Sequence, residues 1–271
     1  MIPGWTAWSA RLGAPTWLEA LEPHTTGLLA QQGLKLWTFG QTAAVGIRAG
    51  GVIYPVFPEP WNPEAEHGAR EVLGRSADAW CLIGPSAWVH RAETLLSPFR
   101  LQQRVEYDFL IRGPQTDAVP DGPGEIRAAG EADNDALFPL QEAYEKEEVL
   151  FDPSEFQALA SRLHFWKTMR HQEIAALWLD GKPVAKAGTN ALTRRWAQIG
   201  GVYTRPEHRG RGLQKRLMAF LLAKLASEGR GACLFVKKKN APAIALYRAL
   251  AFQPGGDFTI TYGERRGRVF L

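Results

Sequence analysis

The sequence predicts an α/β protein with mixed sheets, and three observations support this class. Strand-like apolar runs alternate with helix-like apolar stripes along most of the chain. The 271 residues are 45% hydrophobic and 22% charged, the composition of a globular protein with one large or two ordinary domains. Residues 113–124 contain three prolines and three glycines, which is typical of a linker between domains.

The elements of the second half follow from local signals. Asp152 is a helix-capping residue, and Pro153 favours a first helical turn. The Gly181-Lys-Pro183 turn joins two strands into a hairpin. The expected elements are a strand at 125–129, helices at 133–150 and 153–169, strands at 174–180, 184–191 and 197–204, a helix at 212–228, a strand at 232–236, a helix at 242–251 and a strand at 257–262.

The first half repeats this order. Its expected elements are strands at 35–39, 43–48 and 52–57, a helix at 64–73, a strand at 79–83, a helix at 86–96 and a strand at 104–111. The same succession of three strands, helix, strand, helix and strand starts at residue 174. We therefore expect two copies of one fold, with domains at 1–112 and 125–271 and a linker at 113–124.

Composition excludes several classes of protein. No apolar run is long enough to cross a membrane, and the first residues lack the basic and apolar segments of a secretory signal. The two cysteines, Cys81 and Cys233, lie in apolar runs, so we expect buried free thiols and a cytoplasmic protein. The six histidines are scattered, so we expect no metal site. Homo-oligomerisation stays open.

The segment 200–216 carries the strongest chemical signal. A strand ends at Thr204, and a helix opens at about Gly212 after a basic, glycine-rich turn. Unpaired N–H groups and the helix dipole make such a helix N-terminus an anion site, and a pyrophosphate fits it. The alternatives are a basic surface turn or a dinucleotide site, although the three-glycine fingerprint of the latter is incomplete. Lys237–Lys239 follows the next strand and is a further candidate near phosphates.

Two motifs resemble those of a known family. Arg209-Gly-Arg-Gly212-Leu-Gln214 resembles the acetyl-CoA pyrophosphate motif of the GNAT superfamily of acyltransferases. The segment 240–252, with Asn240 and Tyr247, resembles the later Asn and Leu-Tyr motif of that family. The resemblance covers about 125–263. The whole chain is similar to bacterial two-domain members whose N-terminal half is a degenerate GNAT-like module.

The resemblance implies roles for particular residues. The backbone of Val202, Tyr203 and Thr204 would contact the pantetheine arm of acetyl-CoA. Asn240 would contact acetyl-CoA on the pantetheine side. The pyrophosphate would be held by the turn residues Arg209, Gly210, Arg211, Gly212, Leu213 and Gln214. Gln214 departs from the family, which has Gly or Ala there, and its side chain would narrow the site. Ala251 stands in the usual Gly position before Phe252.

The resemblance also makes Tyr247 the general acid that protonates the leaving thiolate. A phenol is protonated at pH 7 and suits this role, whereas the spacing of Ile244 and Tyr247 also fits a core position. The strand 197–204 has no carboxylate for a general base. Glu145 and Glu148 are the candidates for a base or for binding a cationic amine, and a solvated helix face is the alternative.

These observations favour an acetyl-CoA-dependent N-acetyltransferase that acts by direct attack of a small-molecule or peptide amine in a ternary complex. The alternative is a non-catalytic acyl-CoA-binding or regulatory module, because the strand carboxylate is missing and Gln214 departs from the motif. The net charge is +4, and the basic residues gather mainly in one turn, which argues against nucleic acid. The acidic segment 58–66 predicts that the first half has no cofactor site.

Overall fold

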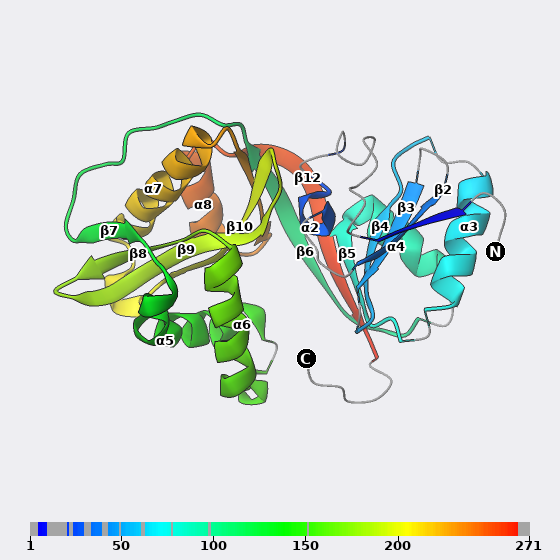
Figure 1. Ribbon diagram of the computed structural model, residues 1–271, viewed down its shortest axis with the longest axis horizontal. Coiled ribbons are helices and arrows are strands. Elements are labelled where there is room, and N and C mark those ends of the chain that lie inside the picture. Colours follow the sequence, from blue (N-terminus) through cyan, green and yellow to red (C-terminus); the bar gives the residue numbers. More distant parts are fainter. Residues whose placement is uncertain are drawn as a thin grey trace. The chain divides into compact units, whose positions relative to one another are not determined.

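The computed structural model describes residues 5–9, 21, 24–29, 34–39, 43–48, 50–60, 63–76, 78–96, 99–150 and 152–264 (Figure 1). The N-terminal stretch for which we expect no secretory signal lies mostly outside these residues. The chain forms two compact units. Unit 1 contains Met1–Leu110, Phe235–Ala241 and Pro254–Leu271, and unit 2 contains Ile111–Leu234 and Pro242–Gln253.

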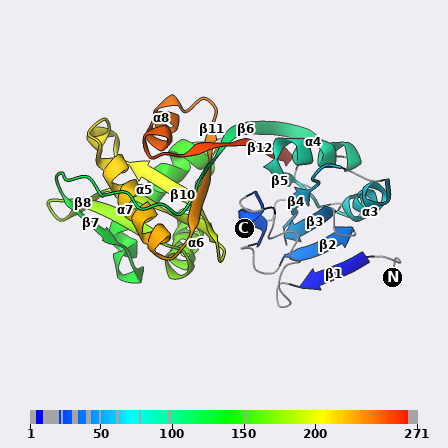
Figure 2. The same ribbon diagram turned by 90° about the horizontal axis from the view of Figure 1, so that it is seen from above.

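Unit 1 is built on strands with two longer helices. Its elements are β1 (Trp5–Ser9), α2 (Thr26–Leu29), β2 (Lys35–Phe39), β3 (Ala43–Arg48), β4 (Val52–Val56), α3 (Pro63–Gly74), β5 (Cys81–Pro85), α4 (Ser86–Leu95), β6 (Leu101–Arg112) and β12 (Gln253–Gly263). The strand order is β1-β2-β3-β4-β5-β12-β6. Figure 2 shows β1 to β5 in this order, with α3 and α4 on one side.

The unit 1 sheet contributes apolar side chains to a core on each of its faces. It can do so because successive side chains of a strand point to opposite faces. Ile53 and Phe57 belong to the cluster that packs on α3 and α4. Val56 belongs to a second cluster with Leu28 of α2 and Leu36. The strands therefore alternate between two apolar cores.

The remaining elements lie wholly or mostly in unit 2, and only the end of β11, from Phe235, and the first residue of α8 belong to unit 1. They are β7 (Glu125–Ala128), the 3₁₀ turn Glu131–Asp133, α5 (Asn134–Tyr144), the π-helical turn Glu145–Val149, the 3₁₀ turn Pro153–Glu155, α6 (Ala158–His171), β8 (Ile174–Leu179), β9 (Lys182–Leu192), β10 (Trp196–Thr204), the 3₁₀ turn Pro206–His208, α7 (Leu213–Ser227), β11 (Gly231–Lys237) and α8 (Ala241–Ala249). Their strand order is β11-β10-β9-β8-β7. In Figure 1 this sheet lies between α5 and α6 on one side and α7 and α8 on the other.

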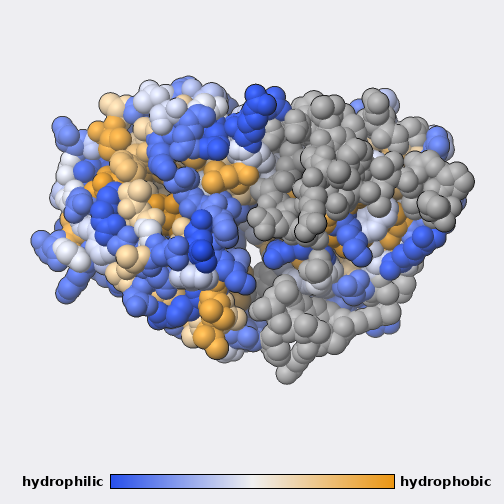
Figure 3. Space-filling model, in the orientation of Figure 1, coloured by the Kyte–Doolittle hydropathy of each residue, from blue (hydrophilic) through white to orange (hydrophobic). Residues whose placement is uncertain are grey.

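The core on the α5 and α6 side joins the helices to the sheet. Leu137, Phe165 and Tyr203 belong to one buried cluster with Ile174 and Ala176 of β8. The visible surface of unit 2 is mostly hydrophilic (Figure 3). Large apolar side chains nevertheless stay exposed on α6, namely Leu159, Leu163 and Trp166. Helix α6 thus buries only the stripe that contains Phe165 against the sheet.

The predicted elements are confirmed in both halves, with differences at two helices. The helix expected over 133–150 is α-helical only to Tyr144, and the N–H of Leu150 then bonds to the Glu145 carbonyl, five residues back. The segment expected as one helix over 153–169 is divided, because the extended residues Phe156 and Gln157 separate the 3₁₀ turn Pro153–Glu155 from α6, which starts at Ala158. The short elements β1 and α2 were not predicted.

Strand β12 pairs with a strand of the first half. Phe258 to Tyr262 lie antiparallel to Pro85 to Cys81. The Thr259 and Ser86 hydroxyls are 2.6 Å apart, and the Thr261 hydroxyl donates to Glu93 at 2.6 Å. The compact units therefore divide the chain differently from the domains 1–112 and 125–271, which stay a prediction.

Two further expectations concern the cysteines and membrane-spanning helices. Cys81 and Cys233 are buried, as predicted, and they form no disulfide with each other. Within the described ranges, no helix combines the length and the apolar composition needed to cross a bilayer.

Candidate active site

The candidate site starts where β10 leaves its parallel neighbour. Trp196–Gln198 pair with Gly231–Cys233 of β11, and β10 then continues to Thr204 along β9 alone among the described strands. The pairing with β9 shifts register between Gly200 and Tyr203, which makes a β-bulge. Gly201 has φ +61 there, a left-handed conformation that favours glycine.

The glycine-rich turn leads from β10 into an uncapped helix. Gly210 and Gly212 have φ of +72 and +73, and apart from their chain neighbours no heavy atom of the described residues lies within 4 Å of where a Cβ would stand on either. No side chain caps α7, and the N–H of Arg216 is the first to bond back, to the Gly212 carbonyl at 3.2 Å. The N–H groups of Leu213, Gln214 and Lys215 therefore have no intrahelical partner. This end of α7 can bind an anion.

Arg209 joins the turn to two other parts of unit 2. Its Nε donates to the Thr204 carbonyl at 3.0 Å, and its Nη2 donates to Glu147 at 2.8 Å. The guanidinium also lies 5.3 Å from the centroid of the Tyr203 ring. Hydrogen bonding to Arg209 lowers the pKa of Glu147. Arg209 therefore fastens the turn to the end of β10, and it also adds positive charge next to the turn.

Gln214 fills the position where the resembling motif has Gly or Ala. Its Oε1 accepts a hydrogen bond from the Thr204 hydroxyl at 2.7 Å. Its Nε2 is buried and has no hydrogen-bond partner among the described residues. The side chain thus links α7 to β10 and leaves one buried donor beside the turn.

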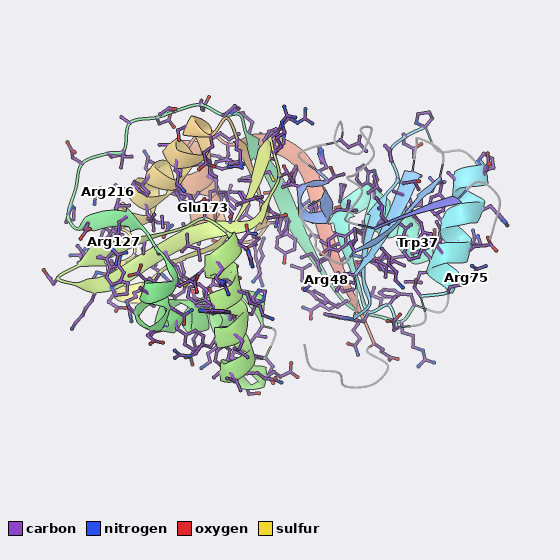
Figure 4. All side chains as sticks on the ribbon, viewed as in Figure 1. Trp37, Arg48, Arg75, Arg127, Glu173 and Arg216 are labelled. Carbon is purple, nitrogen blue, oxygen red and sulfur yellow. The ribbon has the colours of Figure 1, made fainter. Side chains whose placement is uncertain are left out.

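Arg216 holds the linker rather than facing the turn. Its Nε donates to the Pro120 carbonyl at 2.9 Å, and its Nη1 donates to the Pro123 carbonyl. Figure 4 labels Arg216 beside α7 and the linker. The linker residues 113–124 have no regular secondary structure, and Arg216 anchors their last part to α7.

Tyr247 is buried in unit 2 with only 7% of its surface exposed. Its ring packs edge-on against Phe252, with centroids 5.7 Å apart. Burial raises its pKa well above 10, and the nearby Tyr144 and Glu148 raise it further. The phenol is therefore fully protonated at neutral pH. The two expectations for Tyr247, core position and proton donor, are compatible in this environment.

The predicted acidic residues have different surroundings. Glu145 accepts a hydrogen bond from Gln141 Nε2 at 2.6 Å, whereas Glu148 interacts electrostatically with Tyr144 and Tyr247. The π-helical turn separates the two, so they do not share the α-helical face expected from their spacing. Their assignment as a base or amine-binding pair stays a prediction.

Asn240 lies in the turn before α8 and belongs to unit 1. Its N–H donates to the Lys237 carbonyl at 2.8 Å. Its expected contact with the pantetheine arm stays a prediction.

In the first half, Glu64 and Glu66 occupy the first turn of α3, where carboxylates would repel an anion. This supports the expectation that the first half has no phosphate site.

Sequence reasoning missed Lys186, a buried lysine of β9. Only 3% of its surface is exposed, and its Nζ donates to the Gly201 carbonyl at 2.8 Å. Burial lowers its pKa to about 7, against a weaker opposite influence from Glu145. The one signal in the sequence was a single charge inside the apolar run 183–187.

The profile of the acetyltransferase (GNAT) family matches residues 137–252, from α5 to the residue before β12. The chain carries a GNAT acetyltransferase domain. The turn after β10 and the segment around Tyr247, which carried the resemblance in the sequence, both lie inside this domain.

Solved structures extend the likeness beyond the GNAT domain. A GNAT-family acetyltransferase from Novosphingobium aromaticivorans is 25% identical, with a TM-score of 0.54 over 86% of this chain and 89% of that chain. A tandem GNAT protein from the clavulanic acid biosynthesis pathway is 17% identical, with a TM-score of 0.58 over 98% and 99%. The predicted tandem GNAT-like fold is therefore confirmed. No curated protein matches the chain significantly.

Replacing Lys186 by Met should change how stability depends on pH. The pKa of Lys186 is about 7 in the folded chain and 10.5 in the unfolded one, so the unfolded chain binds more protons between these values. The wild type should therefore gain stability relative to Lys186→Met as pH rises above 7, by up to about 1.4 kcal/mol per pH unit. Below pH 7 the difference should be constant.

Urea unfolding of both proteins at pH 6, 7, 8 and 9 measures this difference. The groups facing Lys186 are Tyr144, Glu145 and Tyr203, and all are kept in the variant. Burial raises the pKa of Tyr144 to about 12, so its opposite influence starts only above this range. A difference that does not change between pH 7 and 9 contradicts a titrating, buried Lys186.

Proposed function

We propose that the chain is an acetyl-CoA-dependent N-acetyltransferase that acetylates a primary amine by direct attack. One arrangement carries the proposal. Strand β10 leaves β11, bulges at Gly201 and runs through the glycine turn into the uncapped start of α7. The arrangement supports the proposal because the backbone N–H groups proposed for the acyl group and for the phosphate belong to one continuous segment.

The residues of the turn fit a pyrophosphate. The backbone is open at Gly210 and Gly212, and three consecutive N–H groups at the start of α7 lack intrahelical partners. The unpartnered Nε2 of Gln214 supplies a further buried donor beside them. These observations support the turn residues Arg209 to Gln214, with the β10 backbone of Val202, Tyr203 and Thr204, as the binding segment.

Bound acetyl-CoA would supply a thioester to the attacking amine and leave as the thiol. The N–H groups of Val202–Thr204 would stabilise negative charge on the carbonyl oxygen. Tyr247 would give its proton to the leaving sulfur as the carbon–sulfur bond breaks. Glu148 or Glu145 would take a proton from the amine nitrogen, directly or through water, as the amide bond forms.

The non-catalytic acyl-CoA-binding module stays the second candidate. It is favoured by one observation, since β10 offers no carboxylate beside the bulge. The proposed acceptor is a small-molecule or peptide amine rather than a nucleic acid. Cys81 and Cys233 are buried thiols that form no disulfide with each other, which supports a reducing compartment, and we propose that this is the cytoplasm.

A thiol-release assay with acetyl-CoA and a panel of small primary amines and peptides tests the proposal. We expect thiol release only when an acceptor is present, with the acetylated amine detected by mass spectrometry. Calorimetry with acetyl-CoA runs beside it. Binding without turnover across the panel favours the binding module, and absence of binding contradicts both functions.

A further inference from the structure

The bulge of β10 is held by side chains instead of by the neighbouring strand. The pairing with β9 matches Gly200 with Gly188 and Tyr203 with Lys186, which leaves Gly201 and Val202 outside the ladder. Peptide groups that leave a ladder need other hydrogen-bond partners when they are shielded from water. The partners of Gly201 therefore decide how this peptide is oriented.

Both polar groups of Gly201 have side-chain partners. Lys186 Nζ donates to its carbonyl oxygen at 2.8 Å. The Tyr144 hydroxyl accepts a hydrogen bond from its backbone N–H. One partner comes from β9 and the other from the end of α5, so Gly201 is clamped from two elements of unit 2.

Lys186 is enclosed by aromatic rings. Its Nζ lies 4.8 Å from the centroid of Tyr144 and 5.6 Å from that of Phe165. Burying an amine in such a place costs free energy, and a methionine of similar length would fill the space without that cost. The hydrogen bond to Gly201 is therefore the specific contribution of Lys186 to this part of the fold.

The orientation of Gly201 determines that of Val202. In a trans peptide the C=O of one residue and the N–H of the next point in opposite directions. Because the Gly201 carbonyl points to Lys186, the Val202 N–H points away from it. Val202 has no partner in the pairing of β10 with either β9 or β11.

We propose that Lys186 is a positioning residue that holds the Gly201 carbonyl and thereby presents the Val202 N–H to the thioester carbonyl of the acyl donor. Tyr144 is the second half of the same clamp. The inference rests on the proposed function, since it assigns the donor a place along β10. A donor aimed at a developing oxyanion contributes about 10²–10³-fold to kcat.

Calorimetry with acetyl-CoA and with CoA separates a role of Lys186 in positioning the Val202 N–H from a general role in keeping the CoA-binding site folded. The two ligands share every phosphate contact and differ only in the acetyl group. We expect the wild type to prefer acetyl-CoA and Lys186→Met to lose this preference, while its affinity for CoA stays within about threefold of wild type. Tyr144→Phe, which keeps the ring under Lys186, should reduce the preference in part. Lys182→Met is the matched control, because Lys182 is an exposed lysine at the start of the same strand.

The outcomes distinguish the inference from the proposed function. If the wild type binds neither ligand, the proposed function fails and the inference with it. If it binds both equally, or if Lys186→Met keeps the preference, the clamp does not position the carbonyl donor and the inference fails alone. If Lys186→Met does not fold, Tyr144→Phe with an unchanged preference overturns it. With an amine acceptor in hand, Lys186→Met should lower kcat far more than it changes the KM for acetyl-CoA.

Discussion

Gly212→Asp should weaken acetyl-CoA binding by about two to four orders of magnitude while the chain stays folded. The new carboxylate would stand at the open start of α7, where the proposed pyrophosphate meets the helix N-terminus. Losing two charge-assisted hydrogen bonds, at roughly 1.5–3 kcal/mol each, corresponds to that loss of affinity. Calorimetry on the full-length variant measures it, with circular dichroism to show that the fold is kept.

Gly212→Asn is the matched control for this variant. Gly212 has φ +73, and Asn and Asp both tolerate the left-handed region, so the two variants share shape and backbone strain but differ in charge. Asn should therefore lose far less affinity than Asp. Equal affinity of the Asp variant and the wild type would place the ligand elsewhere. The wild type should bind one acetyl-CoA per chain, because the sequence predicts an anion-binding turn in the second half alone.

The sequence predicted the elements and the anion-binding turn because both depend on local signals. Apolar periodicity determines whether a segment such as 213–227 is a helix, whatever it packs against. Glycines at 210 and 212 likewise indicate the turn without knowledge of its neighbours, and both adopt positive φ. The order of strands and helices in the two halves followed from the same local patterns.

The partner of β12 could not be predicted from such patterns. Its alternation predicts a strand, but a strand does not specify which edge it joins. The burial of Phe258 and the hydrogen bonds of Thr259 and Thr261 arise only when it lies beside β5. An experiment on separated halves would divide β12 from β5, so the tests above use the whole chain.

Contacts between side chains of different elements could not be predicted from the sequence either. The bond between Arg209 and Glu147 joins residues 62 positions apart, and Lys186 meets Gly201 through the register of β9 and β10. The π-helical turn after Tyr144 is a further case, since its sequence fits continuation of the α-helix equally well. It changes which groups face Tyr247 and leaves Glu148, not Glu145, in electrostatic contact with the phenol.

Tyr247→Phe should lower kcat by roughly 10²–10⁴-fold, the usual contribution of a placed proton donor. The change removes one oxygen and keeps the ring against Phe252, so packing should be almost unchanged. Affinity for acetyl-CoA should also be little changed, because the proton is needed only as the thiolate leaves. The raised pKa of Tyr247 adds an expectation for the wild type: deprotonation of this phenol should not reduce the rate below about pH 10.

The control is Tyr262→Phe, which removes a phenol oxygen in unit 1, beside Trp80 and outside the GNAT domain. It should keep wild-type turnover. Both variants are measured by thiol release with a saturating amine, and single-turnover experiments show whether chemistry limits the rate, since slow product release would hide a chemical defect. Wild-type single-turnover rates in the Tyr247→Phe variant would leave Tyr247 as a core residue. Tyr144, a second phenol in electrostatic contact with Tyr247, would then be the next candidate to donate the proton to the sulfur.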